Sequence, residues 1–499
     1  MSSGRGPVAA IESDAQNDEQ ARAAIGDVLG HPRFWIAPVA VVIALMSLMA
    51  AVYMGAVVNT RENLHDFHVA LVNEDHGGRV APGEPEMNIG KQIADQLVPT
   101  TAKQGIVLQP MSRADAMDKL YTGKVYGVIA IDANFTNLML GLARSAVLQN
   151  QPVQPRIDVF IHRGSGTFAS SVTTIMADEM SEQVNKQAGE QLLDNVRSQV
   201  GRSFTIAGAS QLALSHPVNI VVSEPHPLPD GAANGLSAFY FTLLLVLAGF
   251  TGAMMVQILV DAQLGQMPIE FGPLFLLRRR LAVSRWGTLA SKWTIMLIIA
   301  VVQSGLFLLV CSLVGTELPN AFILWAYSVL VIFAVGVTAS SMMAAFGNPG
   351  LLMNLIFFVI LGLPSSGGTV PLEASPRLFS WIAAVEPMHL VYYGVRSILY
   401  FDADPASGLT RSVIMTVIGL VFGLVLGIVS TKYYDGKGWF RRPNTVSVPP
   451  RLAKLVDADT AASVTLIEVP AGSSVHGRHE AADDDPEPPV SQPNVTPHR

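Results

Sequence analysis

Long apolar stretches that contain no charged residue constrain this chain more than any other feature of its sequence. These stretches are residues 34–58, 236–260, 293–314, 321–345, 350–363 and 413–430. A hydrocarbon core about 30 Å thick needs roughly 20 apolar residues in a helix, so most of the stretches are long enough to span a bilayer. Only 14% of the 499 residues are charged, compared with about 25% in a typical soluble domain. We therefore predict a polytopic α-helical membrane protein.

The stretch 350–363 is the shortest, because as a helix it reaches only about 21 Å. It is either a re-entrant or buried segment, or a span to which residues 346–349 contribute. Basic residues gather in the loop 261–287 and again after the last stretch, and cytoplasmic segments carry such an excess of Lys and Arg. Only six spans place both basic segments on the cytoplasmic side. We therefore predict a multi-pass plasma membrane protein with both termini cytoplasmic and helices at 34–58, 236–260, 288–314, 321–345, 347–363 and 412–431.

The same six-span topology places residues 59–234 outside the cytoplasm, as a large extracytoplasmic domain between the first two helices. Alternating hydrophobicity predicts strands at 68–72, 125–131 and 156–161, with helices between them, so we expect an α/β domain. The other predicted segments are a cytoplasmic N-terminal tail (1–33), an outer amphipathic segment (364–411) within the bundle region 235–431, and a cytoplasmic tail (432–499) disordered from about 471.

An apolar stripe runs through residues 169–200 and predicts one long helix in the outer domain. Val172, Met176, Met180 and Val184 begin this stripe, which recurs every four residues. The stripe packs either on its own domain or against a second chain, and the pattern allows both.

The sequence lacks the motifs of common enzyme sites. It has no G-x-x-x-x-G-K-[ST] loop, no H-E-x-x-H and no G-x-S-x-G. His65, His68 and His76 lie near acidic residues, but their spacing fits no zinc pattern, so we interpret them as surface histidines. The single Cys311 excludes an intrachain disulfide, and a net charge of -7 argues against nucleic acid as a partner. We predict a protein that is not an enzyme, with no catalytic, cofactor or metal residues.

Few polar residues interrupt the predicted spans. Lys292 lies near a cytoplasmic end and is expected to snorkel toward the head groups. We find no buried carboxylate in the spans, and proton-driven pumps normally need acidic or histidine side chains there. This pattern argues against a proton-driven pump.

A row of small residues marks one face of the last span. Gly419, Gly423 and Gly427 form a tandem small-xxx-small pattern, which lets helix backbones approach closely. This candidate packing face lies either within the bundle or in a homodimer contact.

The cytoplasmic loop after the second span mixes apolar and basic residues. Phe271, Leu274 and Phe275 could anchor a partner, and three arginines follow: Arg278, Arg279 and Arg280. The loop either docks a cytoplasmic ATPase through a short helix, or serves as a topogenic charge cluster on anionic lipid.

The segment after the fifth span is amphipathic, aromatic and rich in proline. Its marker residues are Pro371, Glu373, Pro376, Trp381 and Pro387. We expect this segment to lie at the outer membrane interface.

Three local matches and the order of the spans carry a resemblance to a known family. The matches are the sequence LVNED at 71–75, the segment 123–133 leading into Asn134-Phe135-Thr136, and the segment 371–388. Over residues 34–435 the chain resembles the phage-infection-protein (Pip/YhgE-like) group of type-2 ABC exporter permeases. The second motif of that group usually has proline and serine around the phenylalanine, where this chain has Ala133 and Thr136.

The resemblance implies a permease subunit that exports a substrate from the cytoplasm with a separate ATPase. The alternative is a non-transporting surface protein, such as a phage receptor or a scaffold of a type VII-like secretion machine. The resemblance also implies two membrane halves, so a homodimer or a heterodimer with a similar permease is expected, surrounded by membrane lipid.

Overall fold

The computed structural model describes residues 32–79, 86–148, 153–200, 215–272, 274–276, 281 and 283–439. Within these residues, six helices are long and apolar enough to cross a membrane. They are Pro38–Val57, Ala233–Gln263, Arg285–Leu313, Ala321–Phe346, Asn348–Ser365 and Leu409–Gly436. Six candidate spans were predicted, and each of them, including the short fifth one, corresponds to one of these helices. The predicted terminal tails 1–31 and 440–499 lie outside the described residues.

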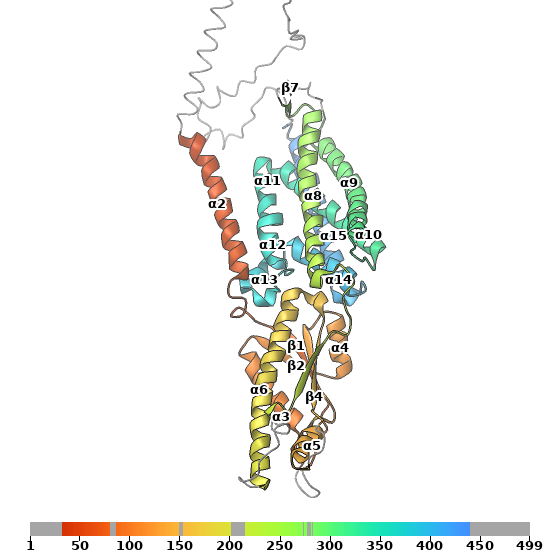
Figure 1. The fold of residues 1–499 in the computed structure, drawn as a ribbon. Helices are drawn as coiled ribbons and strands as arrows, with labels where there is room; N and C mark the ends of the chain where they lie inside the picture. The colour runs from red at the N-terminus through yellow and green to blue at the C-terminus, as the bar shows by residue number, and fades with distance from the viewer. Residues whose placement is uncertain are drawn as a thin grey trace, which may run out of the picture. The chain divides into compact units, whose positions relative to one another are not determined.

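The six spans run alongside one another (Figure 1), and one helix packs against four of the others. The bundle consists of α2 (Pro32–Val57), α8 (Leu236–Gln263), α9 (Arg285–Leu313), α10 (Ala321–Phe346), α11 (Asn348–Leu355) and α15 (Leu409–Gly436). Helix α10 packs against α8, α9, α11 and α15, so its apolar residues are buried on several sides, including Val331 and Val337. Helix α2 meets the bundle near its C-terminal end, where the hydroxyl of Tyr53 donates to the carbonyl of Val359 at 3.0 Å.

The fifth span begins directly after the fourth. Gly347 has φ = 67°, a conformation that glycine adopts without the Cβ clash of other residues, so α10 can end and α11 can start there. The span continues as a π-helical turn, η3 (Ile356–Leu361), and a last α-turn, α12 (Gly362–Ser365). Together these three pieces supply the length that the apolar stretch 350–363 lacks.

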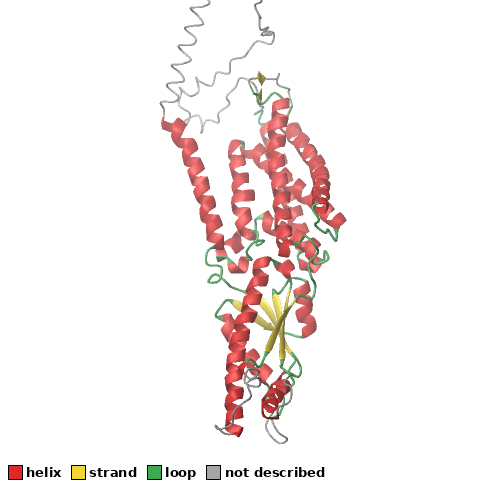
Figure 2. Ribbon diagram, in the orientation of Figure 1, coloured by secondary structure: helices red, strands yellow, loops and turns green. Residues whose placement is uncertain are grey.

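The segment between the first two spans contains a five-stranded sheet covered by helices (Figure 2). Its elements are β1 (Phe67–Asn73), α3 (Ile89–Ala102), β2 (Ile106–Pro110), α4 (Arg113–Tyr121), β3 (Gly127–Ile131), α5 (Phe135–Leu148), β4 (Arg156–Ile161), η1 (Arg163–Ser165), α6 (Thr167–Val200), β5 (Asn219–Ser223) and η2 (Ala233–Gly235). We call the part from β1 to β5 the sheet domain. The strand order is β2-β1-β3-β4-β5, and only the β3–β4 pair is antiparallel.

Both faces of the sheet are buried, which explains the continuous apolar runs in its central strands. Helices α3, α5 and α6 cover one face, and α4 covers the other. Met176, Met180 and Val184 of α6 belong to the core of the sheet domain, so this part of the predicted stripe packs on its own domain. The predicted α/β fold is confirmed, whereas β2, β5 and α3 were missed.

The segment after the fifth span folds into helical elements. It contains η4 (Leu372–Ala374), α13 (Arg377–Ala383), α14 (Pro387–Tyr400) and η5 (Pro405–Ser407). Helix α14 packs against α8 and α15 and is largely buried. Apolar side chains of α14 such as Val391, Val395 and Ile398 join the core of the bundle, and the position of the segment at the outer membrane interface stays a prediction.

The loop between α8 and α9 holds a small antiparallel hairpin, β6 (Ile269–Phe271) and β7 (Leu274–Leu276). Gly272 lies in its turn with φ = 56°. The described part of this loop therefore contains a hairpin where we expected room for a helix.

Candidate functional sites at the two ends of the bundle

The sheet domain and the bundle meet at the turn η4. The hydroxyl of Tyr126 donates to Oε2 of Glu373 at 2.8 Å, and the backbone N–H of His65 donates to the carbonyl of Glu373 at 2.7 Å. The hydroxyl of Ser375 donates to the carbonyl of Ala56 in α2 at 3.2 Å. Glu373 and its neighbours therefore join the end of α2, the first strand of the sheet and the segment after the fifth span.

A buried arginine lies beside this turn. Arg396 of α14 is 2% exposed, and its guanidinium lies 4.2 Å from the ring centre of Tyr393 and 5.1 Å from that of Phe401. Its Nε has no acceptor within the described part of the chain. A Cβ added to Gly123 of the sheet domain would lie 3.1 Å from Nη2 of Arg396. Cation–π contacts with these aromatic rings therefore stabilise the buried guanidinium.

Burial at the junction shifts the pKa values of two side chains of the sheet domain, His162 and Tyr126. Burial, together with the charge of the nearby Arg396, lowers the pKa of His162 to about 4. The His162 ring stacks on Phe401 at 4.5 Å, and its Nδ1 accepts the backbone N–H of Gly164 at 3.0 Å. Burial also raises the pKa of Tyr126 well above its usual value. Both groups are therefore neutral at pH 7.

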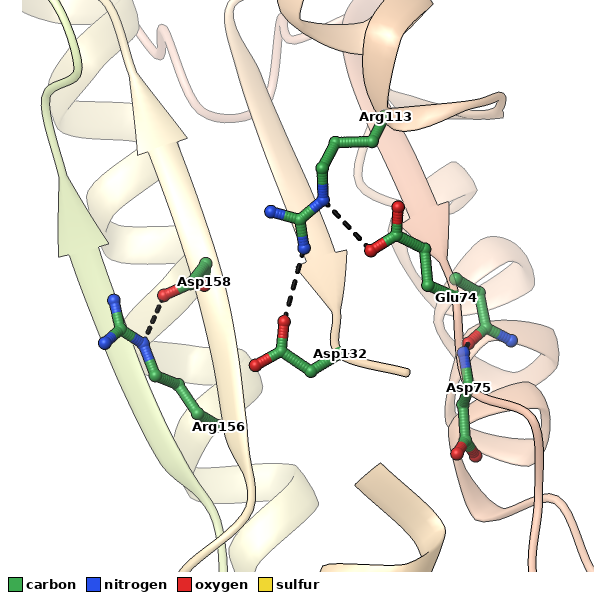
Figure 3. Close-up of polar contacts among 7 residues, drawn as sticks. Glu74, Asp75, Arg113, Asp132, Arg156 and Asp158 are labelled. Carbon is green, nitrogen blue, oxygen red and sulfur yellow. Dashed lines mark hydrogen bonds and ion pairs between the residues drawn. The ribbon is translucent and has the colours of Figure 1, made fainter. Parts of the chain in front are cut away.

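A polar cluster at the carboxyl ends of β1 and β3 explains the LVNED sequence (Figure 3). The carboxylate of Asp75 accepts the N–H of Gly90 at 3.0 Å and of Thr136 at 3.0 Å, so it caps α3 and lies at the start of α5. The Thr136 hydroxyl donates to the same carboxylate. Arg113 bridges Glu74 and Asp132, at 3.0 and 3.2 Å (Figure 3).

This cluster connects the ends of β1 and β3 to the starts of α3, α4 and α5. The Asp75 carboxylate accepts hydrogen bonds from the backbone N–H groups of Gly77, Gly90 and Thr136 and from the Thr136 hydroxyl. Among the described residues, no group of three or more His, Cys, Asp or Glu side chains could hold a metal ion. A hydroxyl is needed at position 136 to reach Asp75, and threonine supplies it as well as serine does.

The opposite end of the bundle contains a buried ion pair. Lys292 of α9 and Asp261 of α8 are both 3% exposed, and Nζ lies 2.5 Å from Oδ1. Gln257 closes the triad, since it accepts from Lys292 at 2.7 Å and donates to Asp261 at 2.9 Å. The predictions of a snorkelling Lys292 and of spans without a buried carboxylate are wrong, because α8 continues past residue 260 and carries Asp261 to the lysine.

Hydrogen bonds made by two residues of α15, Asp435 and Tyr434, connect helices at this same end of the bundle. The Asp435 carboxylate at the end of α15 accepts the backbone N–H groups of Arg285 and Trp286, both at 3.0 Å. It thereby satisfies free donors at the N-terminus of α9. The Tyr434 hydroxyl donates to the carbonyl of Ala345 at the end of α10 at 2.8 Å. The ends of α8, α9, α10 and α15 are therefore connected around the hairpin loop.

The predicted coupling residues lie in or after this hairpin. Phe271 is in β6, and Leu274 and Phe275 are in β7. The three arginines at 278–280 lie outside the described residues.

The structure separates the three glycines of the predicted packing face. A Cβ at Gly423 would lie 2.6 Å from Oγ1 of Thr338 in α10, and one at Gly427 would lie 2.6 Å from the Trp293 ring in α9. A Cβ at Gly419 would meet nothing within 4 Å. Gly423 and Gly427 therefore pack within the bundle, whereas Gly419 faces open space.

The marker residues of the segment after the fifth span are spread over its elements. Glu373 belongs to η4, Pro371 directly precedes η4, and Pro376 precedes α13. Trp381 of α13 is 77% exposed, and Pro387 is the first residue of α14. Only Glu373 among them reaches the junction site. Arg396 was missed, although a lone arginine inside the apolar, tyrosine-rich run 390–400 is a signal that could have indicated it.

Fold and sites together define a polytopic membrane protein with an α/β domain inserted after its first span. The chain belongs to a family described as "Protein of unknown function (DUF3533)", whose profile matches residues 39–425. It is 28% identical over 110 residues to "Uncharacterized protein YhgE" of Bacillus subtilis (strain 168), which covers 22% of this chain and 14% of that protein. It is also 28% identical over 179 residues to "Putative transport permease ycf38" of Porphyra purpurea, which covers 34% of this chain and 57% of that protein.

The chain thus spans well under two thirds of the length of each of these relatives. Both names fit a YhgE/Pip-like permease group, so the predicted resemblance is confirmed.

Proposed function

We propose that this chain is the membrane permease subunit of a type-2 ABC exporter, which moves a substrate out of the cytoplasm with a separate ATPase. In this proposal the hairpin end of the bundle faces the cytoplasm and the sheet domain lies outside. Two copies, or this chain and a similar one, form the complete permease. The relative named as a transport permease supports the class of function.

The buried triad at the hairpin loop is the observation that carries the proposal. Lys292 and Asp261 connect the two helices that flank this loop, and Gln257 extends the connection one turn into α8. A force applied to the loop would therefore move α8 and α9 together, which is what coupling to an ATPase requires. A loop that served only as a charged membrane signal would not need its flanking helices joined in this way.

The experiment is affinity purification of the full chain from native membranes with the double variant Phe271→Ala/Phe275→Ala. We expect an ATPase subunit to be recovered with the wild type and lost with the double variant, with membrane insertion unchanged. Tyr121→Phe/Phe322→Ala is the matched control, because it changes two aromatic residues elsewhere and should leave recovery unchanged.

Recovery of an ATPase at the wild-type level with the double variant would show that the hairpin does not dock it. Recovery of secretion-machine components with no ATPase from the wild type would instead favour a scaffold.

A further inference from the structure

A deep groove runs along the bundle between α10, the fifth span and α15. It encloses about 630 Å³, which lies within the range of roughly 300–1,000 Å³ usual for small-molecule sites. Its walls include Thr338 of α10, Met353 and Phe357 of the fifth span, and Phe422 of α15. Val385, in the turn between α13 and α14, lines it as well. The groove therefore has walls from three spans and from the turn after α13.

The lining has three polar side chains, Thr338, Asn354 and Thr416, and among them the buried side-chain oxygen of Asn354 has no partner within the described part of the chain. The hydroxyl of Thr338 donates to the carbonyl of Ala334 within its own helix at 2.8 Å, and that of Thr416 donates to the carbonyl of Ser412 at 2.8 Å. Apolar side chains make up most of the remaining wall. This lining therefore suits an apolar occupant better than a polar one.

The rim of the groove is apolar and exposed. Phe422 is 60% exposed and Val385 is 73% exposed. Because these residues belong to a bundle of spanning helices, their exposed faces meet lipid chains. Exposed Trp381 lies in α13, next to the end of the groove, and tryptophan is enriched where chains meet head groups. The groove is therefore open to lipid and reaches toward a membrane interface.

Gly419 makes room for an occupant. It lines the groove, and a Cβ built on it meets nothing within 4 Å. Gly423, one turn further along α15, has Thr338 against it instead. Thr338 therefore packs against the helix at Gly423, whereas at Gly419 the groove is open.

We propose that this groove holds a hydrocarbon chain of a membrane lipid, which enters from the bilayer between the fifth span and α15. An extended acyl chain is narrower than a helix, which is about 10 Å across, so it can lie deeper between the walls of the groove than a helix of a second copy could. One extended acyl chain matches the apolar walls and the open side. This site does not depend on whether the protein transports anything.

The test uses the full chain in nanodiscs that contain a phospholipid with a diazirine in one acyl chain. After illumination, the labelled peptides are quantified by mass spectrometry. We expect labelling of α15 near residues 419–422 and of the fifth span near 353–357 to exceed that of the exposed face of α9, for example at Leu309 and Val310. The plug variant Gly419→Phe should reduce groove labelling to the α9 level.

Gly55→Phe is the matched control, because Gly55 of α2 also has nothing within 4 Å and does not line the groove. It should leave groove labelling unchanged. Equal labelling of the groove and α9 in the wild type would overturn the proposal. So would a Gly419→Phe variant that changes the oligomeric mass while the wild-type groove stays unlabelled, since a second copy would then occupy the groove.

Discussion

The hydroxyl of Tyr126 donates a hydrogen bond of 2.8 Å to the carboxylate of Glu373, although the two residues are 247 positions apart in the chain. Tyr126 precedes β3 of the sheet domain, and Glu373 lies in the turn after the fifth span. The same glutamate accepts the N–H of His65 through its backbone carbonyl. A single turn thus links the inserted domain to the membrane bundle. A movement of the domain would therefore displace this turn of the bundle, and the reverse also holds.

Removal of the Tyr126 hydroxyl should loosen this link. We expect Tyr126→Phe to lower the free energy of unfolding by about 1–2 kcal/mol, because a bond to a charged acceptor is lost and a partly buried carboxylate keeps one donor fewer. Thermal unfolding of the full chain in nanodiscs measures the effect. Tyr121→Phe is the control, since that ring contacts His226, with ring centres 4.4 Å apart, and lies outside the junction; an equal loss for both variants would contradict the assignment.

The buried ion pair should respond differently to single and double changes. Lys292→Met or Asp261→Asn alone should cost about 3–5 kcal/mol, because each leaves a charged group buried without its partner. The double variant Lys292→Met/Asp261→Leu should recover most of that loss. Chemical unfolding in nanodiscs provides the measurement.

The exposed pair Arg61–Glu179, at 3.0 Å, supplies the control for these variants. Arg61→Ala should change the free energy of unfolding by about 1 kcal/mol or less, since solvent screens the pair. Single variants of the buried pair that behave like Arg61→Ala would show that water reaches the triad.

Acid should weaken the junction through His162. Burial lowers the pKa of this side chain to about 4 in the folded protein, from 6.5, so the folded state favours the neutral ring. Its contribution to stability is complete above pH 6.5 and declines as the pH falls toward 4, by about 1.4 kcal/mol per pH unit. His162→Phe can still stack on Phe401 but cannot titrate, so its stability should fall less between pH 7 and pH 5 than that of the wild type. Parallel pH profiles would disprove this role.

The glycines of α15 should tolerate substitution unequally. Gly423→Leu should destabilise the bundle by about 1–3 kcal/mol, because the new side chain must displace Thr338. Gly419→Leu should be tolerated, since it extends into the groove. Thermal unfolding of the two variants provides the comparison, and equal losses would contradict the packing described for Gly423.

The orientation of the bundle can be read from two exposed lysines. In a Cys311→Ser background, we expect Lys91→Cys in α3 to react with an impermeant maleimide on intact cells, and Lys437→Cys at the end of α15 to react only after lysis. The reason is that the sheet domain is proposed to lie outside and the basic end inside. Reaction at position 437 on intact cells would reverse the orientation.

The strongly periodic elements of this protein follow from its sequence. Charge-free stretches predict the spans, because a bilayer core excludes unpaired charges and open backbone. The apolar strand at 127–131 and the serine N-cap before α4 were also predictable, since both depend on neighbours in the chain. Ser112 accepts the N–H of Asp115 in the structure, as that cap requires.

Strands β2 and β5 were missed for a physical reason. They are the two edges of the sheet, where one side of the backbone is unpaired and the apolar pattern is weakest. Their place comes from pairing with β1 and β4, which no local pattern encodes.

The sequence by itself determined the spans, the inserted α/β domain and the basic end of the chain, because each depends on local composition and period. Only the tertiary structure decided which polar groups meet. Asp261 pairs with Lys292 because α8 runs past its apolar stretch, Arg396 is buried because α14 enters the bundle, and Gly419 faces a groove while Gly423 does not. Each of these outcomes depends on a neighbouring helix that lies far away in the chain, and therefore on packing rather than on local pattern.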